Sequence, residues 1–225
     1  MQHAEDAGLN TRPATSGPGT PRETTRGTSG ETTGGTSQEG GHPDARADGR
    51  ATTSGPLRAP LLVTLELAQP AQGMFQSLRD RHFPRDRNVV PAHISMFHAL
   101  PGAEREAIGK RLRAVTATQP PVRIEAPFPL GCGVGFRLHA PGLLSLRAEL
   151  AREWALWLTP QDRQDYRPHI TVQNKVTPED ARETLARLQN GFVPFLTAGV
   201  SLRLWRYLGG PWEALETIEL ALPED

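Results

Sequence analysis

The first 58 residues contain almost no large apolar side chains, and this limits which part of the chain can fold. Thr, Ser, Gly, Pro and Glu dominate the segment, as in the run from Thr24 to Gly30. Such a composition cannot bury enough apolar surface to offset the entropy that is lost on ordering. We therefore predict a disordered tail over residues 1–58 and one compact domain over residues 59–225.

Hydrophobic periodicity in residues 59–225 alternates between that of strands and that of helices. Alternating apolar residues predict strands over residues 61–68, 91–98, 122–128, 133–139, 167–174, 200–208 and 214–220. Apolar residues three or four positions apart predict helices over residues 71–82, 108–115 and 143–157. A further helix is expected between Thr177, a suitable N-cap before Pro178, and Gly191, a suitable stop. The fold class is therefore α+β.

Two of the predicted strands carry the same short pattern. Pro91-Ala92-His93-Ile94-Ser95 matches Arg167-Pro168-His169-Ile170-Thr171. Residues i and i+2 of a strand share a face, so each histidine lies beside a hydroxyl. Each pattern is followed by a helix and then further strands, which predicts two pseudo-symmetric halves of one domain. Each half would hold an antiparallel sheet and helices, and the two histidines would face a central cleft.

Two imidazoles that face each other across a cleft suit in-line displacement at phosphorus. One histidine deprotonates the attacking oxygen and the other protonates the leaving oxygen, because the unperturbed pKa of histidine is about 6.5. The neighbouring hydroxyls of Ser95 and Thr171 can donate to the non-bridging phosphate oxygens. We expect no metal and no cofactor, since the imidazoles manage the protons themselves.

His93-Ile94-Ser95 and His169-Ile170-Thr171 resemble the paired His-x-Thr/Ser motifs of the 2H phosphoesterase superfamily. The most similar branch is that of the bacterial 2′-5′ RNA ligase-like proteins, also described as RNA 2′,3′-cyclic phosphodiesterases. The resemblance runs from about residue 59 to the end, and residues 166–175 are its most family-like stretch. Ser95 replaces the commoner threonine and keeps the hydroxyl.

The resemblance implies a bilobal α+β fold around a central cleft. It also implies metal-independent hydrolysis of 2′,3′-cyclic phosphates or 2′,5′-phosphodiesters in RNA ends or nucleotides, with RNA ligation as the reverse reaction. It assigns His93 as the proton donor, His169 as the proton acceptor, and Ser95 and Thr171 as the phosphate ligands.

Four further residues are candidates for substrate binding. Strand alternation places Phe97 and Gln173 on the faces of the two motif histidines. Phe97 would stack on a nucleobase or belong to the core, and Gln173 would contact ribose or phosphate or lie at a solvated strand end. Arg167 and Lys175 flank the second motif, where cationic charge attracts phosphate, although surface salt bridges would also explain them.

A zinc site is the main alternative for the histidines. It would need His93, His98 and His169 together, but alternation places His98 on the face opposite His93, so such a site requires a β-bulge. Cys132 is the only cysteine and lies in a glycine turn. It can form no internal disulfide and no cysteine-based zinc site.

Charge and hydropathy bear on partners and location. The formal net charge is zero, from 25 basic and 25 acidic residues. This argues against tight non-specific binding of nucleic acid and is compatible with an RNA end or a cyclic nucleotide as the substrate. The chain shows neither a membrane-spanning run nor a secretory signal, so we expect a cytoplasmic protein without membrane partners. Nothing in the sequence requires more than a monomer.

Two other functions are compatible with the same residues. One is a non-catalytic RNA- or nucleotide-binding module that keeps the cleft without turnover. The other is a 2H enzyme that acts on a small cyclic phosphate metabolite. Retention of both histidines and both hydroxyls favours an enzyme over the binding module.

Overall fold

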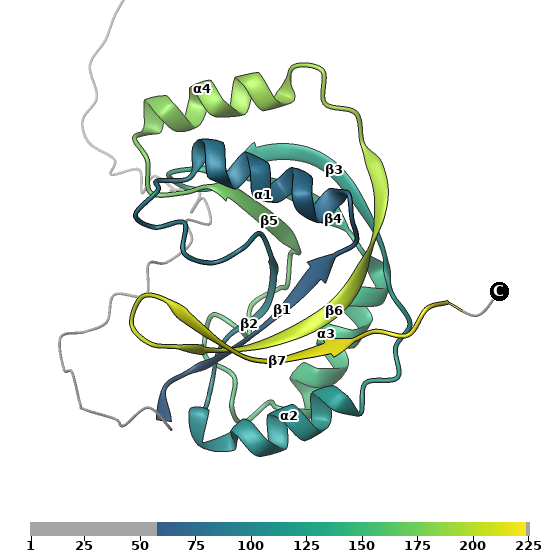
Figure 1. Cartoon of the computed structure of the whole chain (residues 1–225). Helices are drawn as coiled ribbons and strands as arrows, with labels where there is room; N and C mark the ends of the chain where they lie inside the picture. The colour runs from purple at the N-terminus through teal and green to yellow at the C-terminus, as the bar shows by residue number, and fades with distance from the viewer. Residues whose placement is uncertain (1–57, 224–225) are drawn as a thin grey trace, which may run out of the picture. The chain divides into compact units, whose positions relative to one another are not determined.

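The computed structural model describes residues 58–223, so the tail predicted for residues 1–58 lies almost entirely outside the described residues. The described part is an α+β domain, as expected from the sequence (Figure 1). No helix in this part of the chain has the length and apolarity needed to cross a bilayer. In chain order the elements are β1 (Leu61–Leu67), α1 (Ala71–His82), β2 (Ile94–Leu100), a 3-10 turn (Gly102–Glu104), α2 (Arg105–Arg113), β3 (Pro121–Pro129), β4 (Val134–His139), α3 (Pro141–Glu153), β5 (His169–Gln173), α4 (Pro178–Gln189), β6 (Phe195–Tyr207) and β7 (Trp212–Glu219).

The strands of both predicted halves are joined in one antiparallel sheet. Its order is β1-β2-β5-β4-β3-β6-β7, and β1 also pairs with β6, so the first six strands of this order form a closed ring. Strand β6 serves both halves, because residues 195–198 pair with β3 and residues 199–206 pair with β1. One half therefore consists of β1, β2, β7 and the end of β6. The other half consists of β3, β4, β5 and the start of β6.

Strand β6 begins at Phe195, five positions before the predicted start, because its first residues pair with β3 rather than with a hairpin neighbour. The helix predicted over residues 143–157 ends at Glu153. Trp154 follows the helix and packs on Phe97, with 5.1 Å between the ring centroids. The apolar pattern that predicted a longer helix therefore reflects core packing by residues beyond the helix end.

Strands β2 and β5 meet at a single antiparallel pair, Ile94 and Ile170. Both side chains are 0% exposed and belong to the hydrophobic core. This pair is the only point at which the first motif strand bonds to the second within the described residues. It therefore sets the relative position of the two His-x-hydroxyl motifs.

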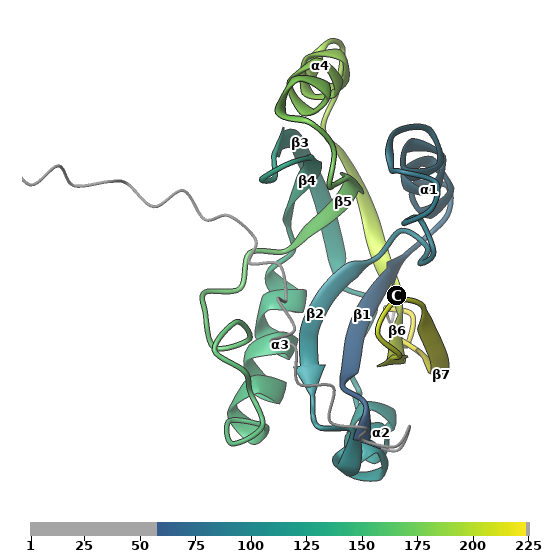
Figure 2. The same ribbon diagram turned by 90° about the vertical axis from the view of Figure 1, so that its left-hand side faces the viewer.

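Two of the helices, α1 and α3, cross between the halves. Helix α1 follows β1 but packs against β5 of the other half. Helix α3 follows β4, and its Arg147 bonds to the carbonyl of Met96 in β2. Figure 2 shows α1 and α4 toward one end of the strands and α2 toward the other. Each motif strand therefore rests on a helix from the opposite half.

Helix α4 begins as the sequence predicts. Its N-cap is Thr177, whose Oγ1 accepts a hydrogen bond from the backbone N of Asp180 at 3.1 Å. The same hydroxyl donates to the Asp180 carboxylate at 2.7 Å. The cap satisfies one of the backbone donors that a helix start leaves unpaired.

We expect Thr177→Ala to lower the free energy of unfolding by about 1 kcal/mol, because alanine cannot accept from the Asp180 amide. Urea denaturation of the full chain measures the effect. Thr116→Ala is the matched control, since Thr116 is exposed and lies outside the helices. Equal stabilities of the two variants would contradict the role of the cap.

Candidate functional site

The two motif histidines are held in the same way. Nδ1 of His93 lies 2.7 Å from the carbonyl of Pro91, and Nδ1 of His169 lies 2.9 Å from the carbonyl of Arg167. A carbonyl only accepts, so each Nδ1 carries the proton and each Nε2 is the nitrogen that can take one up. Both rings are half-buried. The identical contact, made two residues upstream in each case, agrees with the predicted pseudo-symmetry.

The register of β2 and β5 brings the four motif residues together. Ile94 and Ile170 face each other and point into the core, so the residues on either side of them point to the opposite face. In an antiparallel pair this register places His93 beside Thr171 and Ser95 beside His169. The two imidazoles are close enough for the charge of His169 to lower the pKa of His93.

A β-bulge in β2 overturns the expectation for Phe97. Ser95 pairs with Thr64 and Phe97 pairs with Val63, so Met96 is an extra residue between them. The bulge turns Phe97 away from the face of His93 and into the core, where it is 0% exposed. The prediction that Phe97 stacks on a nucleobase is therefore wrong.

A second bulge, in β5, overturns the expectation for Gln173. Thr171 pairs with Gly135 and Gln173 pairs with Val134, so Val172 is the extra residue. Gln173 is buried on the face opposite Thr171, and its Nε2 donates to Oγ1 of Thr184 in α4 at 2.9 Å. It does not share the face of His169, and the prediction that it contacts ribose or phosphate is wrong.

Arg167 and Lys175 lie at the two ends of β5, and both are exposed. Arg167 supplies the carbonyl that holds His169. Lys175 adopts a positive φ of 59°, and its backbone N donates to Oδ1 of Asn174 at 2.8 Å. Their expected contact with substrate phosphate remains a prediction.

Burial makes both histidines weak bases. Removal from water lowers the pKa of His93 to about 4, against the opposing effect of its bond to Pro91, and the charges of Arg79, His98 and His169 add to the decrease. The pKa of His169 is also lowered, first by burial and then by His98, while its bond to Arg167 opposes the shift. Both rings are therefore neutral at pH 7 in the unliganded protein.

Two buried arginines tie the motifs to the helices. Arg79 of α1 donates from Nη1 to the carbonyl of Thr171 at 2.9 Å and from Nη2 to the carbonyl of Val90 at 3.2 Å. Arg147 of α3 donates from Nε to the carbonyl of Met96 at 3.4 Å and from Nη2 to the carbonyl of Asp162.

The two arginines are equivalent under the pseudo-symmetry. Each bonds to a carbonyl at the bulge of the opposite half's motif strand and to a carbonyl in the loop that follows its own helix. A bulge leaves backbone groups outside the strand ladder, and a buried carbonyl without a donor is costly. Burial lowers the pKa of Arg79 to about 10, against the opposing charge of Asp80, so its guanidinium remains charged at neutral pH.

Helix α1 also fixes the residue that precedes His93. Nε2 of Gln72 donates to the carbonyl of Ala92 at 2.7 Å, and the backbone N of Ala92 donates to Oε1 of Gln76 at 2.8 Å. Both backbone groups of Ala92 are therefore held by one helix. This restricts the position of His93, which lies just before the first residue of β2.

Aromatic rings flank both histidines, and sequence patterns did not identify them as neighbours of the site. The ring of Trp212 lies 5.0 Å from that of His93, and the ring of Phe128 lies 6.1 Å from that of His169. Arg137 lies over Phe128 at 5.0 Å from the ring centroid. Trp212 and Phe128 reach the site through pairings distant in sequence, so no local spacing indicates their role.

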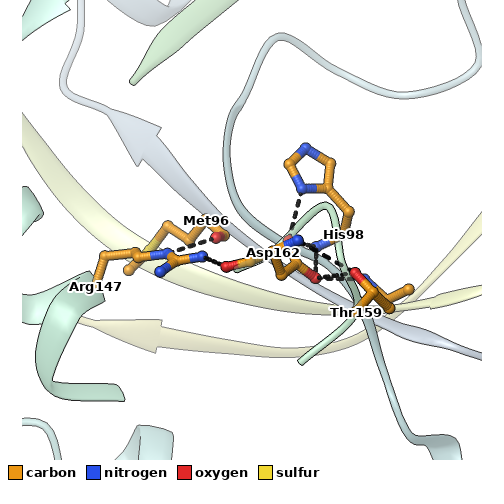
Figure 3. A network of polar contacts seen from close by, with 6 residues as sticks. Met96, His98, Arg147, Thr159 and Asp162 are labelled. Carbon is orange, nitrogen blue, oxygen red and sulfur yellow. Dashed lines mark hydrogen bonds and ion pairs between the residues drawn. The ribbon is translucent and has the colours of Figure 1, made fainter. Parts of the chain in front are cut away.

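The structure places a third histidine at the site. The bulge in β2 turns His98 to the face of Ser95, so the expectation that His98 lies opposite His93 is wrong. Its Nδ1 lies 2.9 Å from Oδ1 of Asp162, which is buried in the loop before β5 (Figure 3). Residues 58–223 nevertheless contain no group of three or more His, Cys, Asp or Glu side chains that could hold a metal ion.

We expect Arg79→Lys to lower the free energy of unfolding by about 2 kcal/mol, because one ammonium cannot reach both carbonyls that the guanidinium bridges. Urea denaturation measures the change. Arg81→Lys is the matched control, since Arg81 is exposed on the same helix and should change stability by less than about 0.5 kcal/mol. A loss no larger than that of the control would contradict the bridging role.

The chain matches the sequence profile of the 2′-5′ RNA ligase superfamily over residues 66–211, which is more than half of its length. Comparison with the curated proteins finds no match. The matched range contains both His-x-hydroxyl motifs and the backbone carbonyls that hold His93 and His169.

Several solved structures are similar to this chain at low sequence identity. A protein described as a phosphoesterase has 19% identity and a TM-score of 0.50, over 73% of this chain and 99% of its own. TT0787 of Thermus thermophilus has 17% identity and a TM-score of 0.49, over 73% of this chain and 100% of its own. E. coli LigT, solved with 3′-AMP, has 17% identity and a TM-score of 0.47, over 73% of this chain and 99% of its own.

Proposed function

Because the chain belongs to the 2′-5′ RNA ligase superfamily, a family of phosphoesterases, we propose that it hydrolyses 2′,3′-cyclic phosphates or 2′,5′-phosphodiesters in RNA ends or nucleotides. The proposed mechanism is general acid and base catalysis by His93 and His169 and does not use a metal.

One observation carries the proposal. His93 and His169 flank the Ile94–Ile170 pair on the same face, and each has its Nδ1 on the carbonyl two residues upstream. Both rings therefore have Nε2 as the proton-exchanging atom, and the register places a hydroxyl beside each ring. Two such groups on either side of a phosphorus atom meet the requirement for in-line displacement.

The proposed step opens a cyclic phosphate with one water molecule. Nε2 of the basic histidine accepts a proton from the water as its oxygen bonds to phosphorus. The bond from phosphorus to one ribose oxygen breaks, and the other histidine gives its proton to that oxygen. The product is a phosphate monoester with a free ribose hydroxyl. Following the family pattern, we assign His93 as the donor and His169 as the acceptor.

Binding of the substrate would favour protonation of the histidine that acts as the general acid. Both histidines are neutral in the unliganded protein, because burial lowers the pKa of each. A bound phosphate anion stabilises an imidazolium beside it and so raises the pKa of the donor. The hydroxyls of Ser95 and Thr171 would donate to the non-bridging oxygens, and the exposed cations Arg167 and Lys175 would attract the phosphate.

We expect His93→Ala and His169→Ala each to lower the rate of hydrolysis by about 10²–10⁴-fold, because each removes one of the two proton carriers. The assay uses 2′,3′-cyclic nucleotides and a short RNA that ends in a 2′,3′-cyclic phosphate, with EDTA present. His139→Ala is the matched control, since His139 is exposed at the end of β4.

Three results would refute the proposed mechanism. They are a wild-type protein that is inert on every substrate, turnover that requires an added metal, and variants as active as the control. Binding of nucleotides without turnover would instead identify a binding module.

The lowered pKa values predict an acidic optimum for kcat/KM. This parameter reports the free enzyme, in which one imidazole must be protonated, so it should fall as pH rises above the lowered pKa values and peak below pH 6.5. The optimum of kcat should lie at higher pH, because bound phosphate raises the pKa of the acid. Rates from about pH 4 to about pH 9 test this, and a kcat/KM that rises through neutral pH would contradict it.

A further inference from the structure

The pair formed by His98 and Asp162 has no role in the two-histidine mechanism. The side chain of His98 is 28% exposed, whereas that of Asp162 is 0% exposed. Asp162 lies in the loop between α3 and β5, more than 60 residues from His98 in the sequence. A partly exposed imidazole held by a fully buried carboxylate is an arrangement that orients a ring for contact with a ligand.

The carboxylate of Asp162 accepts backbone hydrogen bonds at the edge of β2 where no neighbouring strand of the described residues accepts them. Beyond Ile94 the strand has no partner in β5, so its outward N–H groups need other acceptors. The carboxylate of Asp162 accepts from the backbone N of His98 at 3.0 Å and from that of Ala99 at 3.2 Å, and Oγ1 of Thr159 donates to it at 3.3 Å (Figure 3). The position of Asp162 is therefore fixed by contacts other than the ring of His98.

The same carboxylate fixes the tautomer of His98. Burial alone would raise the pKa of Asp162, but its bonds to His98 and to the backbone amides hold that pKa below its usual value. An ionised carboxylate only accepts, so Nδ1 of His98 carries a proton and Nε2 is the nitrogen that gains or loses one. Figure 3 shows the ring turned so that this second nitrogen points away from Asp162.

The extra residue Met96 turns His98 to the face of Ser95, which is the face of the two motif histidines. In agreement with this placement, electrostatic interaction with His98 lowers the pKa of His93 and that of His169. The reacting phosphorus must lie between those two histidines, so a group near both lies near the phosphoryl group. The titratable and charged groups around this position include His93 and His169 from the motifs, Asp162 from the loop, and Arg79, whose charge also lowers the pKa of His93.

We propose that His98, oriented by Asp162, is a third substrate-contacting imidazole, which binds a non-bridging oxygen of the phosphoryl group through Nε2. An imidazole N–H near the phosphoryl group is a suitable donor to a non-bridging oxygen, as the hydroxyls of Ser95 and Thr171 are in the proposed mechanism. The assignment rests on the proposed function in one respect, namely that the ligand carries a phosphoryl group.

The first test observes the contact directly. Inorganic phosphate and adenosine 3′-monophosphate are titrated into the full wild-type chain, and the imidazole nitrogens are followed by long-range ¹H–¹⁵N correlation spectra. We expect Nε2 of His98 to shift with the same apparent Kd as the signals of His93 and His169, while Nδ1 keeps its proton. The assignment is overturned if His98 stays unchanged while the other two respond, or if no histidine responds to either probe.

The second test separates a ligand contact from a structural role. In His98→Asn the amide nitrogen replaces Nδ1 toward Asp162 but nothing replaces Nε2, so affinity for both probes should weaken about 10–100-fold. His98→Gln can place an amide nitrogen near the position of Nε2 and should retain more affinity. His139→Asn, at an exposed strand end, should bind as the wild type does. Unchanged affinity of a folded His98→Asn variant overturns the assignment.

The outcomes separate this assignment from the proposed function. Hydrolysis that depends on His93 and His169, with a His98 that neither shifts nor affects affinity, refutes only the third imidazole. A His98 that responds to phosphate in a protein without hydrolytic activity refutes only the proposed reaction. If thermal unfolding shows that His98→Asn does not fold, the wild-type spectra of the first test decide whether His98 contacts the phosphoryl group.

Discussion

The site depends on one pair of facing residues, Ile94 and Ile170. Their side chains are fully buried, and the single antiparallel pairing between them joins the two motif strands. Because side chains alternate across a strand, burial of both isoleucines turns the four motif residues to the opposite face. Hydrophobic burial on one side of the sheet therefore positions the imidazoles and hydroxyls on the other, and a shift of register by one residue would separate them.

The departures from regular strand geometry are as important as the strands. Each motif strand has an extra residue directly after its hydroxyl, Met96 in β2 and Val172 in β5. Each bulge leaves a carbonyl that a buried arginine satisfies, and that arginine comes from a helix that has crossed between the halves. Each bulge thus depends on its arginine, because a buried carbonyl without a hydrogen-bond donor would lower the free energy of unfolding.

The same burial that organises the site sets its electrostatics. Both motif histidines lose water on folding, and their pKa values fall as a result. The protein therefore presents neutral imidazoles whose Nδ1 protons are already committed to backbone carbonyls. A phosphoryl group would supply the negative charge that this site lacks, and its arrival changes the protonation equilibrium of every imidazole nearby. Binding and proton transfer are physically coupled for this reason.

The sequence by itself determined the α+β class, the approximate helices and strands, and the duplicated His-x-hydroxyl motif, because hydrophobic periodicity and short motifs are local properties. It could not determine the faces of Phe97, Gln173 and His98, since strict alternation fails at a bulge and the bulges depend on pairing with distant strands. Nor could it bring His98 to Asp162. Only the tertiary structure decided these points, because strand register and the pairing of buried polar groups arise from contacts between segments far apart in the chain.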